Sequence, residues 1–162
     1  GMIRSSSLFE KLSHGRTKEN IGEIIAECVG IKSDVVENDE LDTGERMILN
    51  FGHPFGHAIE KYMGYGVVPH GKAVAMGMYM ISRAAENRGL TQKGVSEKLK
   101  ACLKANSLPF FSDIDRDGLY SLSIGDKKRT SDKIRVIVCP EIGKSEIVTL
   151  SLNEYKKLLE LI

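Results

Sequence analysis

Three histidines are the side chains of this chain most able to do chemistry. His53 and His57 lie four residues apart in the segment Asn-Phe-Gly-His-Pro-Phe-Gly-His, and His70 opens a long apolar segment. Imidazole is a common metal ligand and proton carrier near neutral pH. A helix that begins at Pro54 would place His53 at its mouth and His57 one turn further on. This cluster predicts a metal or catalytic site, and the simpler alternative is a set of histidines satisfied by packing.

The two closely spaced histidines form an incomplete metal site by themselves. Catalytic zinc usually takes three protein ligands and one water molecule. Glu60 is close in sequence, but it follows His57 by about one turn and could point away. A second metal motif, the calcium-loop-like segment at residues 113–118, is rejected because its closing position, Ile124, cannot bind a cation. We expect helix capping there instead.

Basic and polar side chains near the histidines suit an anionic ligand. Lys32 precedes the cluster. Spacings of four, three and four residues would place four polar side chains along one face: Arg46, Asn50, His53 and His57. A guanidinium binds carboxylate or phosphate through two parallel hydrogen bonds. The run at Lys127 and Lys128 is a second candidate for phosphate, although most such runs are solvated.

Length and composition predict one domain over residues 1–162. The chain is 41% hydrophobic and 28% charged with a net charge of +1, which argues against a nucleic-acid-binding surface. No apolar run is long enough to span a membrane, and no signal peptide is recognisable. Three cysteines scattered along the chain indicate reduced thiols and a cytoplasmic location: Cys28, Cys102 and Cys139.

The apolar pattern predicts a mainly α, multi-helix domain with one small β-hairpin. The segment 71–88 is apolar nearly all round, which indicates the central buried helix. Alternation around a Pro–Gly turn predicts the hairpin at 134–139 and 145–150. Further helices are expected at residues 2–12, 54–63, 92–105, 115–123 and 152–161, with caps at Thr91 and Ser151 and a helical turn at 46–50. Another helix, capped by Thr17, is expected through the apolar repeat at 21–31, and its extension to Val35 and Val36 stays open.

The histidine segment resembles the signature of the 3-dehydroquinate synthase family. The similar stretches are Leu-Asn-Phe-Gly-His-Pro-Phe-Gly-His-Ala-Ile-Glu at 49–60 and His-Gly-Lys-Ala-Val-Ala-Met-Gly-Met at 70–78. Lys32, Asp42 and Arg46, which precede them, also match the family pattern. The resemblance covers the helical C-terminal half of that enzyme. It implies conversion of the seven-carbon keto acid phosphate DAHP to 3-dehydroquinate and phosphate in the shikimate pathway, with NAD and zinc or cobalt.

The resemblance also implies roles for single residues. His53 and His70 match two metal ligands, and His57 matches a histidine implicated in proton transfer. One lysine of the pair at 127 and 128 matches a phosphate contact. The remaining matches, which the family uses at its substrate, are Lys32, Asp42, Arg46 and Asn50.

Several departures from the family pattern limit what the chain is expected to do alone. The family's third metal ligand, a glutamate, falls before Gly1, and so does the NAD-binding N-terminal domain. Pro54 stands where members usually carry Thr, and Lys72 where they carry Glu. We therefore expect the isolated chain to be inactive. Another sugar phosphate cyclase and a non-catalytic helical module remain alternatives, and a homodimer stays open because members commonly form dimers.

Overall fold

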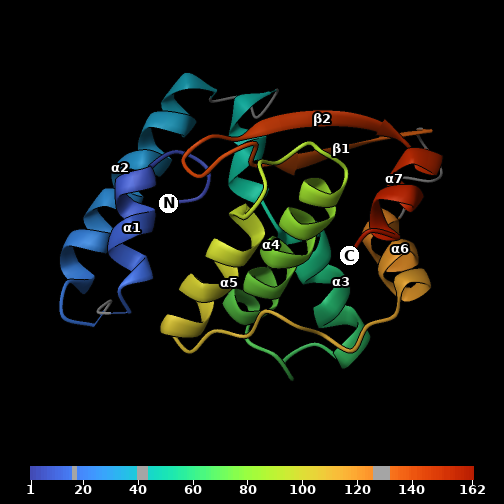
Figure 1. Ribbon diagram of the computed structural model, residues 1–162, viewed down its shortest axis with the longest axis horizontal. Helices are drawn as coiled ribbons and strands as arrows, with labels where there is room; N and C mark the ends of the chain where they lie inside the picture. Colours follow the sequence, from blue (N-terminus) through green and yellow to red (C-terminus); the bar gives the residue numbers. More distant parts are fainter. Residues whose placement is uncertain (16–17, 40–43, 126–131) are drawn as a thin grey trace.

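The computed structural model describes residues 1–15, 18–39, 44–125 and 132–162 and confirms the predicted fold class. Helices surround a central helix, α4, and one antiparallel hairpin runs across one end of the helices (Figure 1). The elements in chain order are α1 (Ser6–Ser13), α2 (Ile21–Asn38), the 3-10 helix η1 (Glu45–Asn50), α3 (His53–Met63), α4 (His70–Asn87), α5 (Val95–Ala105), α6 (Arg116–Ile124), β1 (Lys133–Val138), β2 (Glu146–Ser151) and α7 (Leu152–Leu159).

Helix α4 is buried along most of its length, as its composition predicts. Small residues let neighbouring helices approach its backbone, and the side chains of Ala73, Ala75 and Ala84 are at most 1% exposed. The helix packs against α3 on one side and α5 on another, and the hairpin and α7 also touch it. A helix that is apolar on all faces is stable only where it is covered on all faces, so α4 forms the centre of the core.

The crossing of α3 and α4 brings two backbones into direct contact through glycines. Gly52 precedes α3 with a φ of 79°, and a Cβ atom there would lie 2.7 Å from the backbone nitrogen of Met78. A Cβ atom on Gly77 would collide with the carbonyl oxygen of Gly52 and lie 2.8 Å from the nitrogen of Gly56. These three positions therefore fix how far α4 lies from the start of α3.

The hairpin and the last two helices close the other side of the core. Strand β1 pairs with β2 from Lys133 opposite Ser151 to Val138 opposite Glu146. The Ser151 side chain then accepts a hydrogen bond from the backbone nitrogen of Glu154, and the Glu154 carboxylate accepts one from the backbone nitrogen of Ser151, so α7 begins with a capping box. In the core, the Tyr155 hydroxyl donates to Ser123 Oγ at 2.8 Å and joins α7 to α6.

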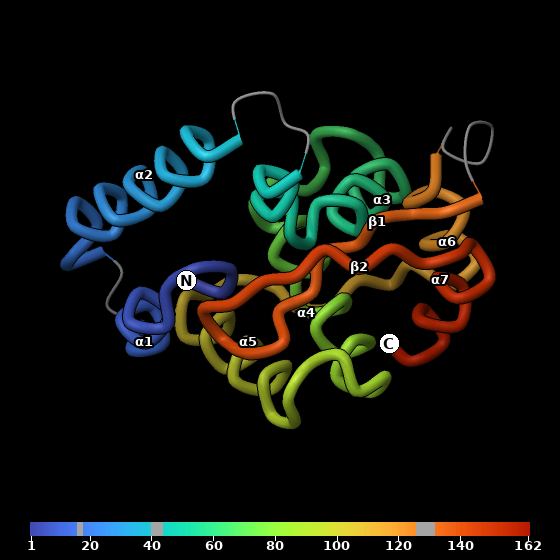
Figure 2. Tube along the Cα trace, turned by 90° about the horizontal axis from the view of Figure 1, so that it is seen from above, coloured from blue at the N-terminus to red at the C-terminus, as the bar shows by residue number. Residues whose placement is uncertain are grey.

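Helices α1 and α2 lie at the edge of the fold, where α2 contacts η1 and lies away from α4 and α5 (Figure 2). The sequence predicts an apolar face on this second helix, but the structure buries only Ile24 and Val35. Ile21, Ile25 and Val29 are 48%, 54% and 61% exposed. Periodicity identified the apolar residues of this helix and does not say what covers them.

Two helix starts differ from the sequence prediction. Helix α1 begins at Ser6 rather than near Met2, because Ser5 caps it by accepting from the backbone of Leu8. Helix α5 begins at Val95, and Thr91 does not cap it. The carboxylate of Glu86, at the end of α4, accepts from the backbone nitrogens at the start of α5 instead. The expected cap at Thr17 lies outside the described residues.

Within the ranges that the structure describes, each helix is too short or too polar to cross a lipid bilayer.

Candidate functional site

The start of α3 places His53 and His57 on the same side of one helix. The left-handed backbone of Gly52 turns the chain into the helix, and Pro54 occupies the first turn, where its missing N–H costs no helical hydrogen bond. The Gly52 carbonyl accepts from the nitrogen of Gly56 at 2.9 Å and starts the helical ladder. The sequence therefore predicted this helix start correctly.

His70 brings the third imidazole to the same place from a different helix. It is the first residue of α4 and follows the turn that reverses the chain after α3. The ring centres of His53 and His70 lie 5.3 Å apart, those of His57 and His70 lie 5.6 Å apart, and those of His53 and His57 lie 5.8 Å apart. Three side chains that the sequence grouped on chemical grounds thus converge in space.

The spacing of these rings fits imidazoles that share one metal ion. Zinc binds an imidazole nitrogen at about 2.0–2.1 Å, so two rings at a tetrahedral angle have centres roughly 5.2 Å apart. The observed ring separations of 5.3–5.8 Å are close to that value. The donor set of imidazole nitrogens with a neighbouring carboxylate is one that zinc and cobalt accept.

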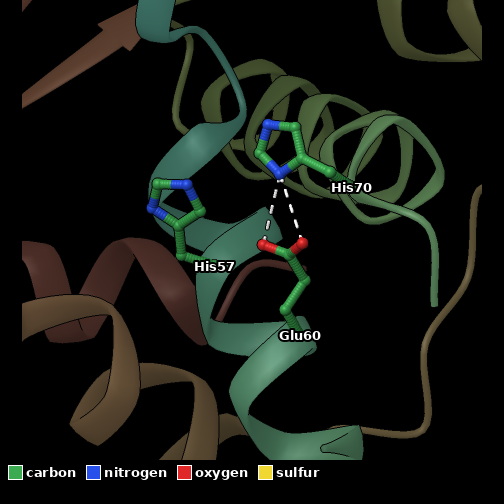
Figure 3. A group of neighbouring side chains, drawn as sticks. All are labelled: His57, Glu60 and His70. Atoms are coloured by element: carbon green, nitrogen blue, oxygen red, sulfur yellow. Dashed lines mark hydrogen bonds and ion pairs between the residues drawn. The ribbon is translucent and has the colours of Figure 1, made fainter. Parts of the chain in front are cut away.

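Glu60 is a member of the cluster that the sequence reading did not place there. Its carboxylate oxygens lie 3.2 and 3.3 Å from Nδ1 of His70 (Figure 3). Potential ligand atoms of His57, Glu60 and His70 all lie within 4.8 Å of one another, and His53 lies beside this group. The sequence places Glu60 three residues after His57 on the same helix, but its meeting with His70 depends on the crossing of α3 and α4.

Burial distinguishes His53 from the other two histidines. His57 and His70 are exposed, whereas His53 is partly buried and lines a largely apolar cavity of about 560 Å³ beside Phe51 and Met78. Burial lowers the pKa of His53, and the other two imidazoles add to this effect; the Phe51 carbonyl opposes it. A neutral imidazole is the form that binds a metal ion.

The predicted substrate residues that the structure describes lie on η1 and α2 rather than on α3 and α4. Arg46 and Asn50 lie in η1, immediately before α3, where Arg46 is partly buried and Asn50 is exposed. Lys32 is exposed on α2, which packs against η1. Lys72 is exposed in the first turn of α4, two residues after His70. The predicted substrate residues Asp42, Lys127 and Lys128 lie outside the described residues.

Sequence comparison identifies relatives along nearly the whole chain. A family model described as 3-dehydroquinate synthase C-terminal matches residues 1–129. The chain is 46% identical over 161 residues to a 3-dehydroquinate synthase of Clostridium perfringens (strain 13), covering 96% of this chain and 46% of the relative. It is 40% identical over 167 residues to one of Clostridium acetobutylicum, covering 100% and 47%. The chain thus spans about half the length of these curated relatives.

Structure comparison finds the same fold in two solved synthases. The 2-epi-5-epi-valiolone synthase ValA of Streptomyces hygroscopicus, with NAD+ and Zn2+ bound, has a TM-score of 0.81 at 18% identity, covering 99% of this chain and 47% of that one. A 2-deoxy-scyllo-inosose synthase complexed with carbaglucose-6-phosphate, NAD+ and Co2+ has a TM-score of 0.72 at 22% identity, covering 89% and 42%. At these identities the likeness shows the fold, and the sequence matches show that this chain belongs to the 3-dehydroquinate synthase C-terminal family.

Proposed function

We propose that this chain is the metal- and substrate-binding part of a 3-dehydroquinate synthase, which converts DAHP to 3-dehydroquinate and phosphate. The observation that carries the proposal is the convergence of His53, His57 and His70, at ring separations that fit a shared divalent ion, in a chain of this family.

The three histidines are proposed to have two different tasks. His53 and His70 hold the metal ion, zinc or cobalt, and a third protein ligand comes from outside the described residues. An ion held there would supply Lewis-acid polarisation of a substrate oxygen. His57 is exposed, and its imidazole exchanges a proton with the substrate.

Basic side chains around the cluster are proposed to bind the anionic ends of DAHP. Arg46 and Asn50 in η1 lead directly into α3, so they are held close to the start of the histidine-bearing helix. Lys32 on α2 adds a further positive charge from a neighbouring element. The contacts of Asp42 and of the lysines at 127 and 128 belong to the proposal on sequence similarity alone.

NAD is proposed to bind outside this chain. The sequence holds no glycine-rich dinucleotide fingerprint, and the chain covers 46% of the length of a curated relative. The two solved cyclases were described with NAD+ bound. We therefore expect the 162-residue chain alone to show no turnover.

Two alternatives have specific support. The shared fold with cyclases named for other products favours a different sugar phosphate as substrate. The positive charge of Lys72 close to His70 favours a module that lost catalysis, because a neighbouring cation weakens metal binding. The identity of 40–46% to 3-dehydroquinate synthases favours DAHP over both.

The decisive experiment is an assay of the longest reading frame that encodes this chain. With NAD and zinc present, we expect release of phosphate from DAHP and formation of 3-dehydroquinate, and no release from glucose 6-phosphate. The His53→Ala variant should lose activity and bound zinc together, while Glu37→Gln, on the exposed face of α2, should keep both. Absence of phosphate release from DAHP by the unaltered protein would reject the proposal.

A further inference from the structure

The Glu60 carboxylate meets only one of the two nitrogens of His70. Both of its oxygens lie at nearly the same distance from Nδ1, 3.2 and 3.3 Å. The Glu60 side chain is 14% exposed, whereas that of His70 is 53% exposed. The carboxylate is thus the more enclosed partner, and its position on α3 limits how the more exposed imidazole at the start of α4 can turn.

The contact with Glu60 selects one tautomer of the neutral His70 imidazole. The ring carries one N–H and one lone pair, and a carboxylate can only accept a hydrogen bond. The proton is therefore held at Nδ1, and the lone pair is at Nε2. In metal sites, the nitrogen that does not bind the metal commonly donates its N–H to a carboxylate, which orients the ring and makes the other nitrogen a better ligand.

We propose that Glu60 is a positioning residue for His70: it fixes the Nδ1–H tautomer and the ring orientation, so that Nε2 is the atom offered to the metal. This inference rests on the assignment of His70 as a ligand in the proposed function. The inference assigns a role to the Glu60 carboxylate: it orients the His70 imidazole before a metal ion binds. The competing arrangement has Glu60 itself binding the ion together with His57 and His70.

The tautomer can be measured on the 162-residue chain without metal. We would record long-range proton–nitrogen correlation spectra of the histidine rings at about pH 8, above the ordinary histidine pKa of about 6.5. His70 is expected to carry its proton on Nδ1. Glu60→Ala should move the proton to Nε2, the form that a free imidazole prefers. Glu60→Gln should keep it on Nδ1, because the amide oxygen still accepts a hydrogen bond.

Zinc titration of the same chain, followed by the histidine ring signals, supplies a second readout. Glu60→Ala should weaken zinc binding by about 10- to 100-fold, the usual effect of removing such a partner. Glu60→Gln should weaken it by less. Glu37→Gln is the matched control, because this carboxylate lies on α2 and accepts only from Ser33 among the hydrogen bonds described for it, and it should change neither readout.

The outcomes separate this inference from the function on which it rests. His70 protonated on Nε2 in the unaltered chain, or on Nδ1 in Glu60→Ala, would overturn the positioning role. Equal and complete loss of zinc binding in Glu60→Ala and Glu60→Gln would overturn it in favour of direct ligation. In either case, loss of zinc binding in His70→Ala would leave the proposed function standing. Zinc binding by His70→Ala as tight as that of the unaltered chain would instead remove His70 from the metal site.

Discussion

The pair α3–α4 and the helix α2 are held in the fold in different ways. Helices α3 and α4 touch backbone to backbone at Gly52, Gly56 and Gly77, and the residues around the crossing are buried. Helix α2 presents an exposed apolar edge that includes Val29 and is joined to α1 by polar contacts. The histidines lie on the first pair and Lys32 lies on α2.

This difference shows which part of the candidate site is fixed by the core. The separation of the imidazoles depends on the close packing of α3 and α4, where a shift of one helix would force a clash. The position of Lys32 depends on a helix that few buried side chains hold. The cluster of imidazoles is thus preformed, whereas the position of Lys32 on α2 is more easily displaced.

The largest expected effect comes from adding one methyl group at the helix crossing. In Gly77→Ala the new Cβ would collide with the Gly52 carbonyl oxygen and crowd the nitrogen of Gly56. Overpacking of this kind costs about 1–3 kcal/mol or more. We therefore expect chemical denaturation to show a loss of about 3 kcal/mol in the free energy of unfolding.

The same substitution on α2 is the matched control and should have the opposite sign. A Cβ atom on Gly30 would meet nothing within 4 Å, and Gly30 is exposed in the middle of α2. Alanine there gains helix propensity of up to about 1 kcal/mol. A destabilised Gly30→Ala, or a Gly77→Ala that unfolds like the unaltered chain, would contradict the difference between the two regions.

A smaller effect is expected at the start of α5, which a side chain of α4 holds in place. Glu86 accepts hydrogen bonds from the nitrogens of Gly94 and Ser96, both at 2.8 Å. Removal of a charged acceptor for backbone donors costs about 1–3 kcal/mol, so Glu86→Ala should lower the free energy of unfolding by that amount at neutral pH. Asn20→Ala is the control, because Asn20 makes no side-chain cap to α2.

The contribution of Glu86 should also depend on pH in a defined direction. Burial opposes the charged form, but the hydrogen bonds from Gly94 and Ser96 outweigh it and hold the pKa of this carboxyl below its ordinary value of 4.5. A carboxyl whose pKa is lower in the folded state stabilises the fold above the unfolded pKa. The stabilisation is lost as the pH falls from that value through the folded one. Urea unfolding at pH 7 and at about pH 3 should therefore show the difference between Glu86→Ala and the unaltered chain shrinking in acid.

The smallest expected effect concerns the attachment of α2. Glu27 accepts from Ser5 Oγ at 3.0 Å and from Lys11 Nζ at 3.1 Å, and the bond from Lys11 leads the causes that lower the pKa of Glu27. Because this carboxylate lies at the surface, Glu27→Gln should leave the melting temperature unchanged. Hydrogen exchange should become faster at the amides of α2 and stay the same in α4. Faster exchange in both helices would show that α2 is part of the same cooperative unit as the core.

Features with local causes could be predicted from the sequence. The proline and glycines around residues 52–64 marked the bounds of α3, and Ser151 followed by Glu154 marked the start of α7. The convergence of the histidines was predicted because their types and spacing were already unusual. The site roles of His53 and His57 stay predictions, since the geometry brings the rings together without assigning them different tasks.

Features with causes distant in the sequence could not be predicted. Glu86 rather than Thr91 caps α5, because the fold of α4 brings that carboxylate to the helix start. The exposure of Ile25 could not be foreseen, since periodicity identifies an apolar face and does not say what covers it. The contact of Glu60 with His70 joins residues ten positions apart across a turn, and only the crossing of α3 and α4 decides whether they meet.

The placement of the imidazoles on two different helices makes ion binding and folding thermodynamically linked. An ion bound by His70 of α4 and by a histidine of α3 would link the two helices. The free energy of coordination would therefore add to the free energy needed to separate α3 from α4. A ligand at one hundred times its dissociation constant raises stability by about 2.7 kcal/mol when only the native state binds it. By the same reciprocity, a substitution that loosens the helix crossing would lower the affinity for the ion without touching a ligand.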